Sequence, residues 1–443
     1  MNQMMKLVKP IAVLFGLLLT ASAQAILPIQ HWTTAQGVQV YFVEAPTIPM
    51  LDVQVDFDAG NRFDKKEKAG VSDLANAILG KGIAAHGNAA GLNESQIAEG
   101  FANLGALRGG SASEDRASIS LRTLSSEPER VEALSLLAQL IAYPSFPENV
   151  LSREKERLIQ AIKEAETKPE TIANKTYSAL LYGNHPYGFD GTAASIAAIS
   201  IADLKQFYAN YYTRDRVVVS MVGAISRAQA EKIAEQLTVN LKPKGIADSP
   251  LQAVVKPATT DRRIEHPASQ SHIFVGTTGV ARGNPDYFAL LVANYTLGGG
   301  GFVSRLYKEV RENRGLAYSV YSYFGIQSQE GPFTIGLQTK REETGNALNV
   351  VKDTLNKFVE TGPTAEETAA AKSNLVGGFS LRIDNNRKIL DNVAAIGFYK
   401  LPIDYLDTWT SKIQSITRDQ AHAAFRKYVD PKQLVTVVVG NAK

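Results

Sequence analysis

Histidine and cysteine carry much of the metal and nucleophile chemistry of proteins, and this sequence offers little of either. It has no cysteine, and its histidines are His31, His86, His185, His266, His272 and His422. No two are four residues apart, so no helix can present paired imidazoles on one face. A G-x-S-x-G elbow and a Walker loop are also missing from the sequence. We therefore predict no metal site and no cofactor in this chain.

One stretch, "LGGGGFVSRLYKEVRENRGLAYSVYSYF" at 297–324, combines residues that can bind anions and carbonyl groups. Its consecutive glycines are Gly298, Gly299, Gly300 and Gly301. They precede a helical pattern, and backbone amides at a helix start can hold an anion. No lysine follows at P-loop spacing, which argues against a nucleotide site. On composition alone, a flexible connection between two helices explains the glycines equally well.

The elements around this stretch occur twice along the chain. Two similar helix-ending segments place Leu79 and Leu297 218 positions apart. Two further segments, each with a helix, a tyrosine, a turn and a β-branched strand, reach Gly223 and Gly440, which are 217 positions apart. Two features at nearly one offset indicate a duplicated fold, because the period is far too long for a solenoid.

Each half begins with alternating apolar strands and continues with helix-rich stretches. This order predicts an α+β fold of two duplicated domains, each a mostly antiparallel sheet with helices packed on one side. The connection is rich in proline, lysine and polar residues and has no periodic pattern. We predict a first domain at 26–241, a linker at 242–262 and a second domain at 263–443.

The N-terminus has the three parts of a secretory signal peptide: lysines, an apolar run, and small residues with Ala23 and Ala25 in an A-x-A arrangement. We predict that residues 1–25 are cleaved and that the protein is periplasmic; an uncleaved anchor is the alternative. No later apolar run could span a membrane, so we expect no stable membrane insertion. Loss of Lys6 and Lys9 lowers the formal charge from +3 to +1, which leaves no electrostatic footprint for nucleic acid.

The ordered motifs of 297–324 resemble the second-domain signature of the pitrilysin/insulinase-type peptidases, the inverted zincins. These motifs are the glycine loop, S-R-L, R-E and G-L-A-Y. The segments "DFDAGNRFD", "KAGVSDLANAILGKG", "NHPYGFDGT" and "FYANYYTRDRVVVSMVG" fit the same family, so the resemblance covers nearly the whole mature chain. It implies half of a clamshell, in which two related α+β domains wall a chamber for unfolded peptide. In bacterial and mitochondrial members the two halves are separate chains.

An active half of this family carries H-x-x-E-H, whose histidines bind zinc with a later glutamate while the motif glutamate activates water. The resemblance places the two histidine positions at Asp73 and Ala77 and the catalytic glutamate at Asn76. The third ligand position falls on Ala161, and Gly109 replaces an asparagine of a neighbouring edge strand. Alanine has no donor atom, and asparagine cannot take a proton from water. We therefore expect a degenerate site that neither binds zinc tightly nor hydrolyses peptides.

The family also uses an arginine and a tyrosine seven residues apart, which reach the zinc site of the other half and stabilise developing negative charge. The resemblance places this pair at Arg311 and Tyr318, with Arg314 as a less fitting neighbour. It further implies that the four glycines form a loop that handles substrate. Without the family, Arg311 and Tyr318 would be taken as a surface arginine and a half-buried core tyrosine.

The leading hypothesis is a non-catalytic subunit of a periplasmic heterodimeric zinc endopeptidase that acts on peptides or unfolded proteins. A homologous partner with H-x-x-E-H would supply the zinc and the base. The alternative is a structural or peptide-binding protein of the same fold with no proteolytic role, as in the core subunits of respiratory complexes. An independent hydrolase finds no supporting constellation of residues in the sequence.

Overall fold

The computed structural model describes residues 27–247 and 252–442 of the 443-residue chain. The predicted signal peptide, residues 1–25, lies outside this described part. Within the described part, no helix combines the length and the apolar composition needed to cross a membrane.

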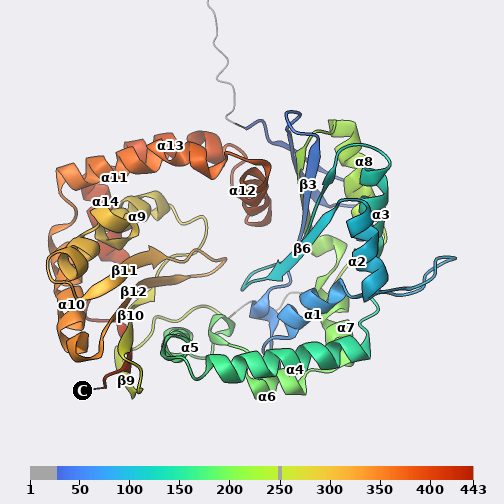
Figure 1. Ribbon diagram of the computed structural model, residues 1–443. Helices are drawn as coiled ribbons and strands as arrows, with labels where there is room; N and C mark the ends of the chain where they lie inside the picture. The colour runs from blue at the N-terminus through green and yellow to red at the C-terminus, as the bar shows by residue number, and fades with distance from the viewer. Residues whose placement is uncertain (1–26, 248–251, 443) are drawn as a thin grey trace, which may run out of the picture.

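Two sheets organise the chain and form the two sides of the arch in Figure 1. The first sheet has the order β1-β2-β8-β3-β7-β6, and the second has the order β11-β12-β10-β13-β9. The first sheet contains β1 (Gln30–Thr33), β2 (Gln39–Glu44), β3 (Met50–Phe57), β6 (Leu107–Ala112), β7 (Ala117–Leu124) and β8 (Val217–Gly223). The second contains β9 (Thr260–Glu265), β10 (Gln270–Thr278), β11 (Ala317–Phe324), β12 (Pro332–Lys340) and β13 (Val435–Gly440). A short hairpin pairs β4 (Gly82–Ile83) with β5 (Leu92–Asn93).

The two sheets have the same topology over five strands. Reading from β2 to β6 in the first sheet and from β9 to β11 in the second gives one connection order, with a single parallel pair at the start. The remaining neighbours in both runs are antiparallel. Gly223 and Gly440, which the sequence comparison paired, are the last residues of β8 and β13. The predicted α+β class and the duplication are confirmed.

The helices complete each repeat. Those before the linker are α1 (Val71–Leu79), α2 (Glu94–Asn103), α3 (Glu129–Ala142), α4 (Glu148–Ala165), α5 (Pro169–Tyr182), α6 (Ala193–Ala198), α7 (Ile201–Tyr211) and α8 (Arg227–Thr238). Those after it are α9 (Tyr287–Asn294), α10 (Thr344–Thr361), α11 (Ala365–Gly377), α12 (Asn386–Phe398), α13 (Tyr405–Ser415) and α14 (Arg418–Tyr428). The predicted linker at 242–262 lies between α8 and β9 and overlaps the first residues of β9.

Each repeat lends one helix to the sheet of the other, and α5 and α12 lie between the two sides of the arch in Figure 1. Helix α5 packs on β10 and β13, where Ala173, Tyr177 and Leu181 join a core with the valines of β13. Helix α12 packs on β2, β3 and β8. Gly397 permits this approach, because a Cβ there would lie 2.7 Å from the ring of Tyr41. The exchange ties the two repeats together.

The residues of strand β2 show why helices can pack on both faces of the first sheet. Val40 and Phe42 belong to the core of the first repeat, whereas Tyr41 and Val43 belong to the core that includes α12. Successive strand residues point to opposite faces, so both faces of β2 are apolar. Helices therefore lie on both faces rather than on the one side that the sequence analysis expected.

Candidate functional site

Helix α1 is fixed by its first turn. Gly70 precedes it with φ at 100°, a left-handed conformation that favours glycine. The buried Asp64 carboxylate accepts hydrogen bonds from the amides of Gly70 at 2.7 Å and Ser72 at 3.1 Å, which satisfies donors that the helix leaves free. Leu74 and Ile78 are buried in the core of the first repeat. Packing and capping therefore set the direction of α1 without any metal.

The degenerate motif positions divide into exposed and buried residues. Asp73 and Ala77 are exposed, and Ala161 is exposed on α4, which packs on α1. Partial desolvation by the surrounding protein and, secondarily, the charge of Glu114 raise the pKa of Asp73. The described residues contain no group of three or more His, Cys, Asp or Glu side chains arranged to hold a metal. Asp73 alone offers oxygen donors at these positions, so the residues present do not fit a zinc ion.

Asn76, at the position of the catalytic glutamate, is buried and already occupied. It is 7% exposed, and its amide nitrogen donates to the carbonyl oxygen of Ser118 and to the Tyr212 hydroxyl, both at 3.3 Å. These bonds link α1 to β7 and to the residue after α7. An amide in this position serves packing and cannot act as a base.

Strand β6 forms one edge of the first sheet and lies beside α1. All of its residues are partly or fully exposed, and Leu107 is 69% exposed. Gly109 and Gly110 fall within this strand, and a Cβ at Gly110 would lie 3.2 Å from the side-chain oxygen of Asn76. The free edge can add an extended peptide as a further strand.

Arg311 and Tyr318 are brought together in the second repeat. Arg311 lies in a π-helical turn, Tyr307–Glu312, and Tyr318 is the second residue of the edge strand β11. The guanidinium carbon of Arg311 is 4.7 Å from the ring centroid of Tyr318, 4.9 Å from that of Tyr307 and 6.0 Å from that of Phe302. We call these four residues the aromatic clasp. Tyr318 is 82% exposed, so the sequence-based alternative of a half-buried core tyrosine is wrong.

The two candidate arginines differ in their partners. Arg314 donates from Nη1 to the Glu309 carboxylate at 2.6 Å and to the Glu309 carbonyl at 2.7 Å. Arg311 forms no ion pair with any carboxylate among the described residues, and aromatic rings hold it instead. Ring contacts position a guanidinium while leaving its N–H groups able to donate. Arg311 is thus the arginine that remains available to a ligand.

The four glycines do not form one uniform loop. Gly298 and Gly299 end the π-helical turn Tyr295–Gly299, and Gly301 begins a 3₁₀ turn with φ at 59°. Gly298 is buried, and a Cβ there would lie 2.5 Å from the Ser322 hydroxyl of β11. Gly298 therefore has a packing role, whereas Gly299 and Gly301 are exposed.

Phe302 and Val303 follow the glycines and were not singled out in the sequence analysis. They are 73% and 65% exposed, respectively. Two adjacent apolar residues after a glycine run were the available signal. Their exposure beside Arg311 adds an apolar surface to the candidate site.

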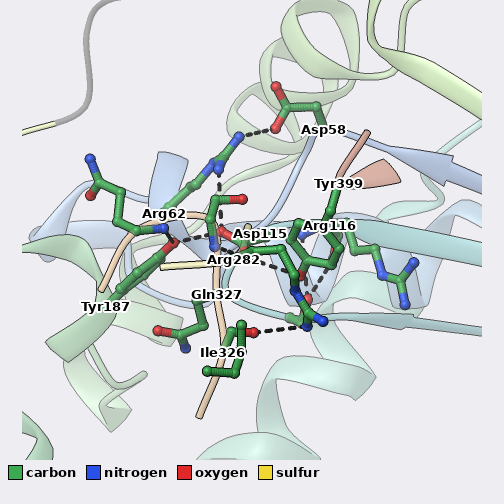
Figure 2. Close-up of polar contacts among 12 residues, drawn as sticks. Asp58, Arg62, Asp115, Arg116, Tyr187, Arg282, Ile326, Gln327 and Tyr399 are labelled. Carbon is green, nitrogen blue, oxygen red and sulfur yellow. Dashed lines mark hydrogen bonds and ion pairs between the residues drawn. The ribbon is translucent and has the colours of Figure 1, made fainter. Parts of the chain in front are cut away.

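A polar network that the sequence analysis also missed joins the two repeats (Figure 2). Its centre is Asp115, which is 1% exposed and lies between β6 and β7. One carboxylate oxygen accepts from the Tyr187 hydroxyl at 2.6 Å and from Arg62 Nη1 at 3.2 Å. The other accepts from the Ser328 amide at 2.8 Å and the Tyr399 hydroxyl at 3.0 Å. Ser328 and Tyr399 belong to the second repeat, so Asp115 fixes one repeat against the other.

The protonation of this network follows from its burial. Burial, reinforced by the Asp115 charge, raises the pKa of Tyr187, and the same causes raise the pKa of Tyr399 to about 12. Both hydroxyls therefore remain protonated donors at neutral pH. The segments "GNRFD" and "NHPYGFDGT" contain Arg62 and Tyr187, but neither segment indicates that the two meet at one carboxylate.

Fold and site together define a half-clamshell of the metallopeptidase type whose sequence lacks H-x-x-E-H. Two family models agree: "Insulinase (Peptidase family M16)" matches residues 39–190, and "Peptidase M16 inactive domain" matches residues 198–375. The chain belongs to the insulinase family of peptidases, M16, and is an inactive member of it.

Curated relatives and solved structures resemble the chain over most of its length. The chain is 29% identical to the "Uncharacterized zinc protease YmxG" of Bacillus subtilis, over 82% of this chain and 87% of that protein. It is 26% identical to the "Non-peptidase homolog YmxG" of Helicobacter pylori, over 98% of each. A crystal structure of a "peptidase M16 inactive domain" from Pseudomonas fluorescens has a TM-score of 0.88 and 38% identity, covering 94% of this chain and 99% of that one. The periplasmic protease PqqL of Escherichia coli shares the fold, with a TM-score of 0.76 and 17% identity, over 93% of this chain and 45% of that one.

Proposed function

We propose that this chain is the non-catalytic subunit of a periplasmic two-chain zinc endopeptidase, to which it contributes Arg311 and Tyr318. The observation that carries the proposal is the exposed aromatic clasp. Tyr318 is 82% exposed, so folding gains little from its ring. Arg311 is held against it without a carboxylate partner among the described residues. Both side chains are thus arranged for contact with another molecule.

In the partner's site the pair would act on the scissile carbonyl. Zinc held by the partner's H-x-x-E-H would supply the activation of water, and the negative charge growing on the attacked carbonyl oxygen would face this chain's pair. The Arg311 guanidinium and the Tyr318 hydroxyl are donors that can stabilise this charge, and the rings around Arg311 fix its position before the reaction. One such donor contributes roughly 10²–10³ in kcat. This chain itself supplies no base and no metal ligand set.

Extended peptides are the substrate class that the sheet edges favour. Strands β6 and β11 each form the edge of a sheet. A peptide that adds to such an edge is bound through its backbone, so many sequences can be accepted if they are unfolded. Peptides and unfolded proteins therefore fit the site better than folded ones do.

The partner is proposed to be a homologous chain that carries H-x-x-E-H. The alignment with 45% of PqqL supports a larger assembly, because more than half of that protein lies outside the shared part. The periplasm is supported by the signal-peptide pattern at residues 1–25 and by the periplasmic location of PqqL.

Reconstitution with the H-x-x-E-H chain tests the proposal. The isolated subunit should cleave no peptide, and the mixture should cleave unfolded peptides. Arg311→Ala in the mixture should lower kcat/KM by roughly 10²-fold or more. Arg314→Ala is the matched control and should change little, since Arg314 is already bonded to Glu309. If Arg311→Ala and Tyr318→Phe both leave the mixture fully active, the contribution in trans is wrong. Peptide binding without cleavage would then favour a structural or peptide-binding role.

A further inference from the structure

A separate cavity lies in the second repeat between α9, α13 and the loop after α12. It has a volume of about 370 Å³, within the range that holds small organic molecules. Its walls include Pro285, Phe288, Ile326, Leu401, Tyr405 and Ile416. None of the aromatic-clasp residues lines it. The cavity is therefore distinct from the site proposed above.

The apolar part of the cavity is a rigid aromatic corner. The rings of Phe288 and Tyr405 lie 6.0 Å apart between centroids at 37°. Phe288 also makes a T-shaped contact with Trp409, with centroids 6.3 Å apart and the rings at 73°. Such a corner suits a flat apolar group, since aromatic pairs prefer offset or edge contacts.

Two cations complete the lining. Lys412 Nζ lies 5.6 Å from the ring centroid of Phe288 and forms no ion pair among the described residues. Arg282 donates from Nη2 to the Ile326 carbonyl at 3.0 Å, and its guanidinium carbon lies 4.4 Å from the ring centroid of Tyr399. Its Nε is buried and has no hydrogen-bond partner among the described residues.

The charged side chains that line the cavity are all positive among the described residues. Among the described residues that line it, two are basic and none is Asp or Glu. Partly buried cations without a counter-ion are unfavourable, and a bound anion would relieve this. The aromatic corner and the two cations together select a ligand with an apolar ring and one negative group.

We propose that this cavity binds a small aromatic carboxylate, with its ring on Phe288 and Tyr405 and its carboxylate between Arg282 and Lys412. Carboxylates pair with a guanidinium and an ammonium through charge-assisted hydrogen bonds, which a neutral amide cannot match. The site is independent of the subunit role proposed above, and its ligand needs no partner chain.

Calorimetric titration of the full mature chain at low salt tests the site with 4-phenylbutyrate and its neutral amide, 4-phenylbutyramide. The carboxylate should bind about tenfold more tightly than the amide. Lys412→Met, which keeps the unbranched stem, should remove most of this preference. Lys427→Met is the control, because Lys427 bonds to Asp286 at 2.8 Å and does not line the cavity. Ile416→Trp should fill the cavity and abolish the binding of both probes.

Equal affinity for the acid and the amide would overturn the proposal, as would no binding of either up to about 10 mM. An acid preference that is undiminished in Lys412→Met would also overturn it, because Lys412 would then play no part in recognising the carboxylate. Thermal unfolding of each variant checks that the fold is intact. If Lys412→Met does not fold, loss of acid binding in Ile416→Trp with a normal unfolding midpoint decides the location.

Discussion

The α1 face of the first repeat and the aromatic clasp of the second hold their polar residues in opposite environments, one buried and one exposed. On α1 the buried Asn76 is 7% exposed and bonded to Ser118 and Tyr212. In the clasp, Tyr318 is 82% exposed and Arg311 has no carboxylate partner among the described residues. Packing within the chain accounts for the position of Asn76, but it does not account for Arg311 and Tyr318.

This difference separates polar side chains that serve packing from polar side chains that stay open to another molecule. Polar side chains whose hydrogen bonds are completed inside the chain contribute mainly to stability. Exposed side chains that the fold positions without satisfying them are free to act on another molecule. The comparison predicts that changes on the α1 side alter stability, whereas changes in the clasp alter activity.

The largest effect on stability is expected at Asp115, whose four hydrogen bonds are all internal. Asp115→Ala should lower the free energy of unfolding by roughly 3–5 kcal/mol, since it leaves the Tyr187 and Tyr399 hydroxyls and the Ser328 amide without their acceptor and leaves Arg62 with Asp58 as its carboxylate partner. Urea unfolding followed by circular dichroism measures this. A loss below about 0.5 kcal/mol would show that the network does not hold the repeats together.

The second-largest effect on stability is expected from pH, through the buried Asp64. Burial raises the pKa of Asp64 to about 7, against hydrogen bonds from Gly70 and Ser72 that lower it. The folded state therefore binds a proton that the unfolded state releases near pH 4. The stabilisation is full below about pH 4 and is lost as pH rises to about 7, by up to about 4 kcal/mol.

Urea unfolding between pH 4.5 and 8 checks the role of Asp64. Asp64→Asn should flatten the curve, whereas Asp419→Asn, at a side chain 91% exposed, should leave it unchanged. Equal slopes for Asp64→Asn and the unaltered chain would contradict the assigned cause.

A smaller effect is expected at Asn76. Asn76→Leu should cost about 1–3 kcal/mol, because the Ser118 carbonyl and the Tyr212 hydroxyl lose a buried donor. Ala77→Ser is the exposed control on the same helix and should stay within about 0.5 kcal/mol. Thermal or urea unfolding compares the two, and a neutral Asn76→Leu would mean that Asn76 has no packing role.

The smallest effect is expected from metal removal. Asp73, Ala77 and Ala161 offer one oxygen-bearing side chain among the three ligand positions, so a chelator should leave the unfolding midpoint of the isolated chain within about 1 °C. Differential scanning calorimetry with and without EDTA measures this. A drop of several degrees would reveal a metal site outside the lost one.

Local pattern was enough to predict part of this molecule. The spacing of Gly223 and Gly440 indicated the repeat, and both glycines end equivalent strands. The resemblance placed Arg311 and Tyr318 seven positions apart, and the turn before β11 brings them into contact. The repeat follows from comparing two local patterns, and the contact between Arg311 and Tyr318 joins residues near one another in the chain.

The exchange of α5 and α12 could not be predicted in the same way. It depends on which sheet each apolar helix face meets, and the partners are far apart in sequence. The Asp115 network combines residues from 62 to 399 for the same reason. The charged cavity likewise appears only when residues 282 and 412, far apart in the sequence, line the same space.

The most direct test of the central claim is the activity of the reconstituted two-chain enzyme with Tyr318→Phe. We expect kcat/KM to fall by roughly 10²-fold, while the unfolding midpoint of the isolated subunit and the zinc content of the partner stay unchanged. The variant differs from the unaltered chain only by the hydroxyl of Tyr318, a residue that is 82% exposed. Full activity in this variant, together with full activity in Arg311→Ala, would contradict the account.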